Sequence, residues 1–351
     1  MVSKVAAKDS LDKIISKSRI HFYKPIQIAE ILYRIRHYGD INPLNLEEYR
    51  NESKRWRDEV SIQLLGRKCT SSARFQDDLF NDNAIPPTVL NTLSQENLST
   101  DGAVEAYIYR RFINKHNQLF NALSYCRDSG KSNFSVINFI NSFWNEPGLK
   151  RSLDKIYEIV VYALFSALIE SLNLKIELSV DESKFDILDE FKDFSQKVMC
   201  LDMAKPKFMQ DAKIYRVGVT NAADRGLDMY SNWGVAIQIK HLSLDTTLAE
   251  NIVNNISSNR IIIVCKDAEQ EIIVSLMTQI GWRSRIQSVV TEKNLVDWYE
   301  KALRGKYADV VGDKLMEILC LEIAEEFPSV ADLPDILKSR HYENIADSFW
   351  T

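Results

Sequence analysis

The sequence lacks an apolar run long enough to cross a membrane, and it lacks the cysteine and histidine spacings typical of metal sites. No stretch of about 18 apolar residues occurs, so no membrane span is expected. The five cysteines lie far apart without a CxxC pattern, which argues against a structural zinc site and favours a reducing compartment. The first residues lack the apolar segment of a signal peptide. We therefore expect a cytoplasmic protein.

An excess of positive charge is also missing. The net charge is -5, whereas proteins that coat nucleic acid without sequence preference are usually basic. DNA binding is still compatible with this total, because a cleft can be locally positive on an acidic protein. The 351 residues, of which 45% are hydrophobic and 26% charged, are typical of a globular protein with a sizeable core. This length suggests two domains, or one large domain with an elaborated lobe.

The first part of the chain, residues 1–149, is predicted to be a helical lobe that serves DNA binding or dimerisation. Apolar residues recur at helical spacing in Pro25–His37, and Pro25 suits a first helical turn. Further helices are expected at Gly102–Cys126 and Phe134–Trp144. The segment Asn145-Glu-Pro-Gly148 interrupts the helical pattern, and we place the domain boundary there.

From residue 150 the pattern changes to alternating helices and strands. Helices are predicted at Leu153–Leu172, Asp186–Leu201, Thr247–Ile256, Ala268–Ile280 and Glu292–Leu303. Strands are predicted at Lys175–Val180, Ile214–Val219, Gly226–Tyr230, Val235–Leu244, Ile261–Cys265 and Arg285–Val290. This order predicts an α/β domain over residues 150–305, with a mixed central sheet flanked by helices. Residues 306–351 are expected to form a helical extension.

One stretch of this domain, from Asp228 to Lys240, has a pattern with chemical meaning. Side chains alternate along a strand, so Gln238 and Lys240 are expected on one face and Ile237 and Ile239 on the other. A hairpin would bring Asp228 beside the first pair. A carboxylate, a neutral oxygen and an amine are the groups needed to hold Mg²⁺ and to activate a water against a phosphodiester.

Each of these residues also has a structural explanation. Asp228 is a residue type common in turns, and Lys240 could extend to solvent at the strand end. Gln238 could serve only to orient water or backbone groups, and Asp224 could be the metal ligand in place of Asp228. The apolar strand favours a functional role, because an inward-facing lysine is costly there without a purpose.

The segments around this pattern resemble the PD-(D/E)XK nuclease superfamily, and within it the type II restriction endonucleases of the HaeII family. The resemblance is carried by Asp224-Arg-Gly-Leu-Asp228, Ala236-Ile-Gln-Ile-Lys240, the apolar run Arg260–Asp267 and the segment Ile280–Ile286. It extends over most of the chain and is clearest over residues 150–305. It implies a restriction-endonuclease-like catalytic core beside the helical lobe.

The resemblance also implies a role for each residue of the pattern. Asp228 corresponds to the metal-binding aspartate and Lys240 to the lysine of the superfamily. Gln238 stands where an Asp or Glu is usual, which removes a negative charge but keeps a carbonyl oxygen suited to a hard cation. The carbonyl of Ile239 is expected as a further ligand. Glu158 matches the helical glutamate of many members, although it could be an ordinary solvated helix residue.

The implied function is DNA restriction, in which both strands of double-stranded DNA are hydrolysed with Mg²⁺, or with Mn²⁺ in its place. A short palindromic site is expected, read by a homodimer whose two-fold symmetry mirrors that of the DNA. The resemblance suggests a GC-rich site with a GCGC centre. The alternatives are a structure-specific repair or recombination nuclease and a catalytically silent DNA-binding protein, and the latter would have little reason to keep Lys240.

Basic side chains supply the candidate DNA contacts. Arginine reads guanine with two hydrogen bonds, so base reading is expected from Arg283 or Arg285 beside the core sheet. The helical lobe supplies Lys54, Arg55, Arg57, Arg110 and Arg111. A charged helix is more often a solvated face than a DNA-binding surface, and this alternative stays open.

Overall fold

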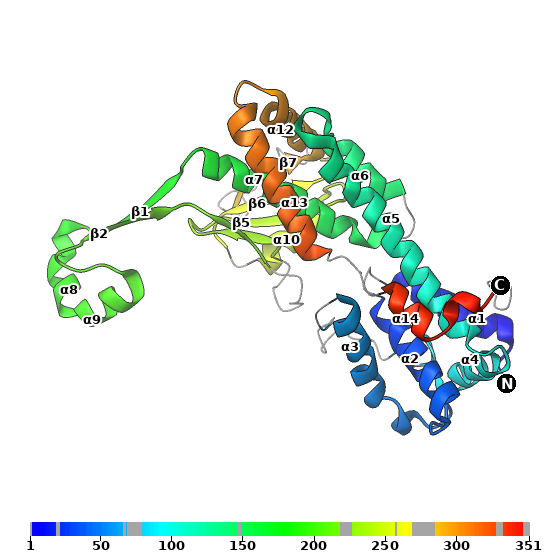
Figure 1. Cartoon of the computed structure of the whole chain (residues 1–351). Helices are drawn as coiled ribbons and strands as arrows, with labels where there is room; N and C mark the ends of the chain where they lie inside the picture. Colours follow the sequence, from blue (N-terminus) through cyan, green and yellow to red (C-terminus); the bar gives the residue numbers. More distant parts are fainter. Residues whose placement is uncertain are drawn as a thin grey trace. The chain divides into compact units, whose positions relative to one another are not determined.

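The computed structural model describes residues 2–18, 22–65, 68, 79–145, 149–217, 227–256, 258–268, 285–327 and 333–346. They belong to two compact units (Figure 1). The helical unit comprises Met1–Ile156 and Cys320–Thr351, and the sheet unit comprises Tyr157–Val217 and Ala223–Leu319. The boundary between the two units, at Ile156 and Tyr157, therefore lies a few residues after the domain boundary that we placed at residue 149. The predicted C-terminal extension, residues 306–351, is shared between the two units.

Amphipathic helices form the helical unit. They are α1 (Lys4–Lys17), α2 (Tyr23–Tyr38), α3 (Glu52–Leu65), α4 (Pro87–Ser99), α5 (Ala103–Asn133) and α6 (Val136–Asn145), with short turns η1 (Leu46–Glu48) and η2 (Lys150–Ser152). Helix α2 packs against α3, α4 and α5, and its residues from Pro25 to Leu32 are all buried. No helix in the described part of the chain is long and apolar enough to cross a bilayer.

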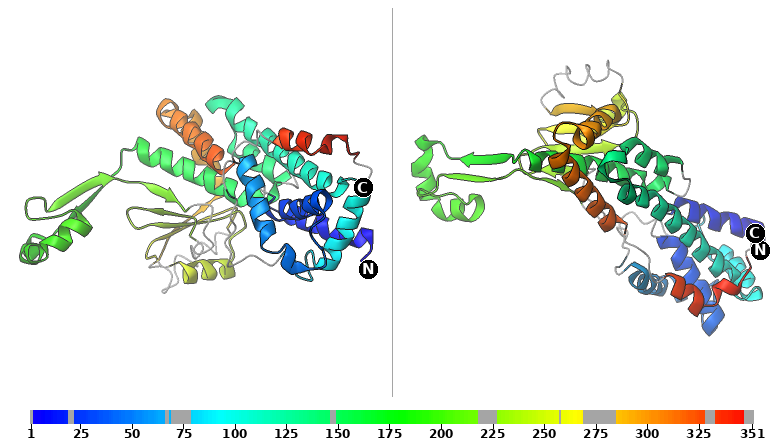
Figure 2. Two further views of the ribbon diagram at one scale, coloured as in Figure 1. Left: turned by 60° about the horizontal axis from the view of Figure 1, so that its bottom comes forward. Right: turned by 45° about the horizontal axis from the view of Figure 1, so that its top comes forward.

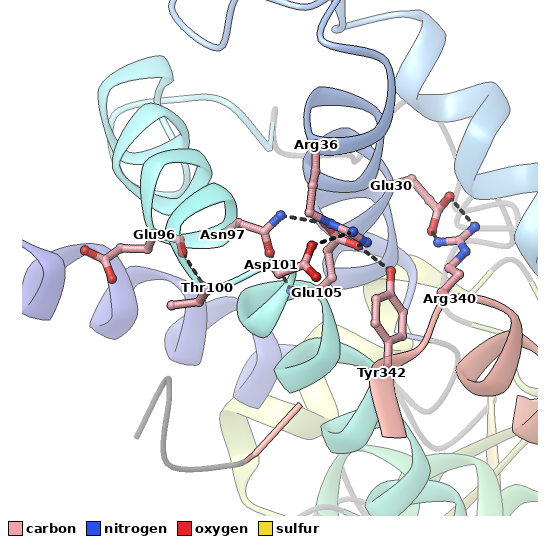
Figure 3. A network of polar contacts seen from close by, with 9 residues as sticks. All are labelled: Glu30, Arg36, Glu96, Asn97, Thr100, Asp101, Glu105, Arg340 and Tyr342. Atoms are coloured by element: carbon pink, nitrogen blue, oxygen red, sulfur yellow. Dashed lines mark hydrogen bonds and ion pairs between the residues drawn. The ribbon is translucent and has the colours of Figure 1, made fainter. Parts of the chain in front are cut away.

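The end of the chain returns to the helical unit through α14 (Leu333–Ser339) and η5 (Tyr342–Asn344). Arg340 forms an ion pair with Glu30 of α2 at 2.6 Å, and the Tyr342 hydroxyl donates a hydrogen bond to Glu105 of α5 at 2.5 Å (Figure 3). Arg36 also pairs with Glu105 at 3.0 Å. Glu30 and Glu105 are 4% and 0% exposed, so these partners offset the cost of burying two carboxylates.

A five-stranded sheet is the centre of the sheet unit. Its spatial order is β3 (Ile214–Arg216), β4 (Met229–Ser231), β5 (Ala236–Lys240), β6 (Ile261–Cys265) and β7 (Ile286–Thr291). The first two pairings are antiparallel and the last two are parallel. Helices α7 (Leu153–Ser171), α10 (Thr246–Asn255), α12 (Glu292–Arg304) and α13 (Ala308–Glu326) accompany it (Figures 1 and 2). This arrangement confirms the predicted mixed sheet flanked by helices.

An arm, residues 172–211, leads away from the sheet of this unit in all views (Figures 1 and 2). It consists of β1 (Lys175–Ser179) paired antiparallel with β2 (Lys207–Asp211), and it carries α8 (Phe185–Glu190) and α9 (Lys192–Phe194) at its far end. At its base, the Ala212 N–H donates to the Leu174 carbonyl at 2.9 Å. The two ends of the arm therefore lie side by side.

The arm is where the sequence predictions were least accurate. The strand predicted at Lys175–Val180 is present, but it pairs within the arm instead of joining the core sheet. The single helix predicted over Asp186–Leu201 is wrong. The backbone leaves helical geometry at Phe191 (φ -101°, ψ 31°), and the segment ends at Cys200 with φ 57°. The helix predicted at Ala268–Ile280 lies almost entirely outside the described residues.

Candidate active site

The antiparallel pairing of β4 and β5 brings Asp228 beside Gln238. Met229 is the register partner of Ile237, and Asp228 directly precedes β4. The carbonyl of Asp228 accepts a hydrogen bond from the Val217 N–H at 2.9 Å, which continues the β3–β4 pairing by one residue. Residues that the sequence separates by ten positions therefore lie side by side.

Two hydrogen bonds fix the Asp228 carboxylate on β5. Its Oδ2 accepts from the side-chain amide of Gln238 at 2.5 Å and from the Ile239 N–H at 2.7 Å. Gln238 is only 2% exposed, so its amide is held inside the unit and not in solvent. Hydrogen bonds of this kind orient a carboxylate and favour its charged form.

Lys240 completes the group at the end of β5. It is the last residue of the strand, it is half-buried, and its register partner on β6 is Cys265. Among the residues that the structure describes, its ammonium has no hydrogen-bond or ion-pair partner. An ammonium at the end of an apolar strand that pairs with no anion among the described residues is suited to an anionic ligand.

Helix α7, which carries Glu158, approaches the sheet near the end of β7. Parallel strands end at one edge, so the carboxyl ends of β5, β6 and β7 carry Lys240, Cys265 and Thr291 together. Tyr157 of α7 donates a hydrogen bond to Glu292, the residue that follows β7, at 2.8 Å. Glu158 is the next residue of α7 and is 6% exposed. The structure thus locates its helical turn near the end of β7 and shows that it is not a solvated side chain.

Sequence reasoning missed the Tyr157–Glu292 pair, because the two residues are 135 positions apart. Burial, and then the neighbouring Glu292 carboxylate, raise the pKa of Tyr157 above its usual range. Burial also raises the pKa of the nearby Cys265 thiol to about 11. Both groups are therefore neutral at physiological pH.

The described residues include no cluster of three or more Asp, Glu, His or Cys side chains that would form a metal cage by itself. The donor set fits Mg²⁺ nonetheless, because this ion is usually held by one or two carboxylates together with water and substrate phosphates. Asp228 supplies one carboxylate. The amide of Gln238 would present its oxygen to the same point after a half-turn, since the two ends of an amide have nearly the same shape. Asp224 lies outside the described residues.

Two of the candidate DNA contacts are engaged within the protein. Arg57 is 3% exposed, pairs with Asp58 at 2.7 Å and donates to Gln27 at 3.1 Å. Arg110 donates to the carbonyls of Tyr342, at 2.9 Å, and of Ile345. These bonds hold α3 against α2 and link α5 to the C-terminal segment, so the buried Arg57 and the half-buried Arg110 both have partners within the protein.

The remaining candidates differ in exposure. Lys54, Arg55 and Arg111 are exposed on the helical unit. Arg285 donates to the carbonyls of Ser258, at 2.9 Å, and of Ile256, at the amino-terminal end of β7. Since β5 and β7 run in the same direction, this is the opposite edge of the sheet from Lys240. Arg283 lies outside the described residues.

Comparisons with known proteins agree with this core. "Type II restriction enzyme HaeII" of Haemophilus aegyptius is 55% identical over 343 residues, which cover 97% of each chain. "Type II restriction enzyme NgoBI" of Neisseria gonorrhoeae is 54% identical over 332 residues, which cover 94% of each chain. No solved structure matches. The family described as HaeII restriction endonuclease matches residues 7–342, which include both units and the whole Asp228–Lys240 stretch. The chain therefore belongs to the HaeII restriction endonuclease family.

Proposed function

We propose that this protein, a type II restriction endonuclease by its family, hydrolyses both strands of double-stranded DNA at a short palindromic site in a Mg²⁺-dependent reaction. The observation that supports the proposal is the hydrogen bond between Gln238 of β5 and the Asp228 carboxylate, with Lys240 two residues further along the same strand. The resemblance to the family suggests a GC-rich site with a GCGC centre, and Mn²⁺ is expected to substitute for Mg²⁺.

Asp228 and the amide oxygen of Gln238 would hold the metal, and the Ile239 carbonyl is a further candidate. When bound, Mg²⁺ supplies the positive charge that lowers the pKa of water and neutralises charge on the phosphate. The hydrogen bond from the Ile239 N–H keeps the Asp228 carboxylate in one orientation throughout. Glu158, a buried residue of α7, is our candidate for a second carboxylate.

Lys240 would act on the phosphodiester itself. Its ammonium can donate to a phosphate oxygen and to the attacking water, which orients the water and stabilises the negative charge that develops as the bond forms. Fixed donors of this type contribute about 100- to 1,000-fold to the rate of comparable reactions. Cleavage would leave 5′-phosphates.

DNA would be held by exposed cations of the helical unit, and we propose Lys54, Arg55 and Arg111 for phosphate contact. They are exposed, whereas Arg57 and Arg110 are engaged inside the protein. We propose Arg283 as the base-reading residue beside the core. A homodimer would place one Asp228–Lys240 site on each strand of a palindrome.

Digestion of phage DNA by the purified protein tests this function. Discrete fragments in the presence of Mg²⁺, absent after chelation, are expected for a site-specific endonuclease. A smear would indicate a nuclease without sequence specificity, and intact DNA at high enzyme concentration would contradict the proposal. Mapping the fragment ends then tests the GCGC centre separately from the cleavage activity.

A further inference from the structure

We infer that the arm, residues 172–211, is the surface through which two copies of this chain associate. The inference rests on the proposed function, because a palindrome is cut on both strands most simply by two active sites related by a two-fold axis. The arm belongs to the same unit as the Asp228–Lys240 site. An association through it would therefore connect the two catalytic sheets directly.

The apolar surface of the arm is the first argument. Ten of its large apolar side chains are between 37% and 73% exposed, and Ile187, Phe191, Phe194 and Val198 are each more than half exposed. Monomeric proteins rarely expose a contiguous apolar surface larger than a few hundred Å². Such a concentration on one projecting element is typical of an interface that is buried in an assembly.

The arm also lacks a sufficient core of its own. Within it, only Leu188, Ser195 and Leu201 are buried. The arm has one two-stranded ribbon, β1–β2, and an isolated ribbon of this kind is at best marginally stable in water. Burial of the exposed apolar side chains against a partner would supply the missing stabilisation.

The charge of the arm favours a protein partner over DNA. Residues 172–211 contain nine Asp and Glu and six Lys, which gives a net charge of -3. A DNA-contacting element is expected to be basic, because it faces the phosphates. Both signs of charge are present, however, so the same patch on a second copy can supply the complementary partners that a two-fold interface requires.

The size of the arm fits a dimer as well. A stable interface uses roughly 20 to 30 residues on each side and buries about 800 Å² per partner. The arm supplies such a number of residues in one continuous segment. Its base is fixed by the Ala212–Leu174 hydrogen bond and by the bond from the Asn232 amide to the Asp211 carbonyl at 2.9 Å, which connect it to the sheet.

Sedimentation velocity of the full-length protein over a range of loading concentrations, without DNA, tests the inference. The wild type is expected to be a dimer, and the double variant Phe191→Ser/Phe194→Ser should raise the dimer dissociation constant by about 100-fold or more. The matched control is Phe120→Ser/Leu98→Ser on the helical unit, where the two side chains are 57% and 50% exposed. This control should stay as dimeric as the wild type.

A second variant covers the case in which the serine substitutions impair folding. Because Leu174 and Ala212 are hydrogen-bonded neighbours, residues 175–211 can be replaced by an Asn-Gly turn that closes the chain between them. We expect this armless protein to fold with an unchanged circular dichroism signal from the sheet unit and to be monomeric. A wild type that is monomeric at all concentrations, or an armless protein that remains dimeric, would overturn the inference.

Failure of the proposed nuclease function gives a different pattern of results. A wild type that dimerises through the arm but never cleaves DNA leaves the interface intact and contradicts only the activity. A monomeric wild type that cleaves both strands contradicts only the interface. If the wild type both dimerises through the arm and cleaves DNA, the arm variants should convert supercoiled plasmid mainly to the nicked form. Each monomer carries the groups needed to cut one strand.

Discussion

The side-chain amide of Gln238 donates a hydrogen bond to the carboxylate of Asp228 across the pairing of β4 with β5. A second carboxylate at this position would place two negative charges about 2.5 Å apart in a buried environment, where they repel strongly. Because the amide of Gln238 is neutral and donates to Asp228, the two side chains can lie together in the folded protein even when no metal ion is bound. We expect the consequence to be a weaker attraction for Mg²⁺ in the absence of DNA.

Asp228→Asn and Lys240→Met should each lower the cleavage rate by at least about 100-fold, because they remove a metal-binding charge and a phosphate donor. Asn keeps an oxygen that can accept the Ile239 N–H, so the fold and DNA binding should be retained. Cleavage assays and gel-shift titrations measure the two effects. Lys213→Met, an exposed lysine of the same unit, is the control, and wild-type cleavage by either site variant would refute the assignment.

Gln238→Glu should make stability depend on the metal. Without Mg²⁺ the two carboxylates repel, and we expect a loss of about 1 to 3 kcal/mol in the free energy of unfolding. The pKa of the introduced carboxyl is raised by folding, so the loss should grow as the pH rises above about 4.3, the ordinary value for Glu. Thermal denaturation with and without Mg²⁺ checks this, and a variant as stable as wild type at pH 8 without metal would disprove it.

Arg285→Ala should affect stability rather than sequence recognition. Its guanidinium donates to the carbonyls of Ser258 and Ile256, and their loss is expected to cost about 1 to 3 kcal/mol. Discrimination between the site and its single-base variants should be unchanged in competition binding. Arg260→Ala, an exposed arginine at the same edge, is the control. Relaxed specificity at one base pair in Arg285→Ala would restore its role as a base reader.

The triple variant Lys54→Gln/Arg55→Gln/Arg111→Gln should weaken binding to all DNA sequences alike. Each lost phosphate contact is expected to reduce the slope of log affinity against log salt by about 1. Titrations at several salt concentrations measure that slope. Replacing Lys213, Lys301 and Lys306, exposed lysines of the sheet unit outside the arm, by Gln removes the same charge and should leave the slope unchanged. Equal slopes for wild type and the first variant would exclude these contacts.

The thiols of Cys126 and Cys320 predict a pH-dependent reactivity. Their sulfur atoms lie 4.0 Å apart, and the hydrogen bond from Cys126 lowers the pKa of Cys320 to about 7. Because this value lies below that of the unfolded thiol, the stability contributed by Cys320 should rise between about pH 7 and 8.5, and it is lost as the pH falls from 8.5 through 7. Alkylation of Cys320, followed by mass spectrometry, should have a midpoint near pH 7. In Cys126→Ala the midpoint should return toward about 8.5, and an unchanged midpoint would contradict the pairing.

The core strands were predictable because their chemistry is local. The run Ile261–Cys265 is continuously apolar, and a strand buried on both faces requires this. The pairing of Asp228 with Gln238 followed from the alternation of β5 and a hairpin of ordinary length. The spacing indicated a role for Lys240 in phosphodiester hydrolysis, and the family resemblance then matched it to the lysine of a known nuclease motif.

The arm and the roles of the arginines were not predictable from local patterns. β2 has charged residues at both ends and little apolar alternation, so its sequence does not distinguish it from a loop. The burial of Arg57 depends on Gln27, and the carbonyls bound by Arg110 lie more than 230 residues away. Such partners are defined only by the tertiary fold.

The ion pair between Glu30 and Arg340 has a consequence for the order in which the protein matures on the ribosome. The two residues are 310 positions apart, which corresponds to roughly 15 to 60 s of synthesis. Until Arg340 and Tyr342 emerge, Glu30 and Glu105 lack the partners that make their burial favourable. The helical unit can therefore reach its final packing only after Arg340 and Tyr342 have been synthesised, and a nascent chain stalled before residue 340 would hold an incomplete lobe.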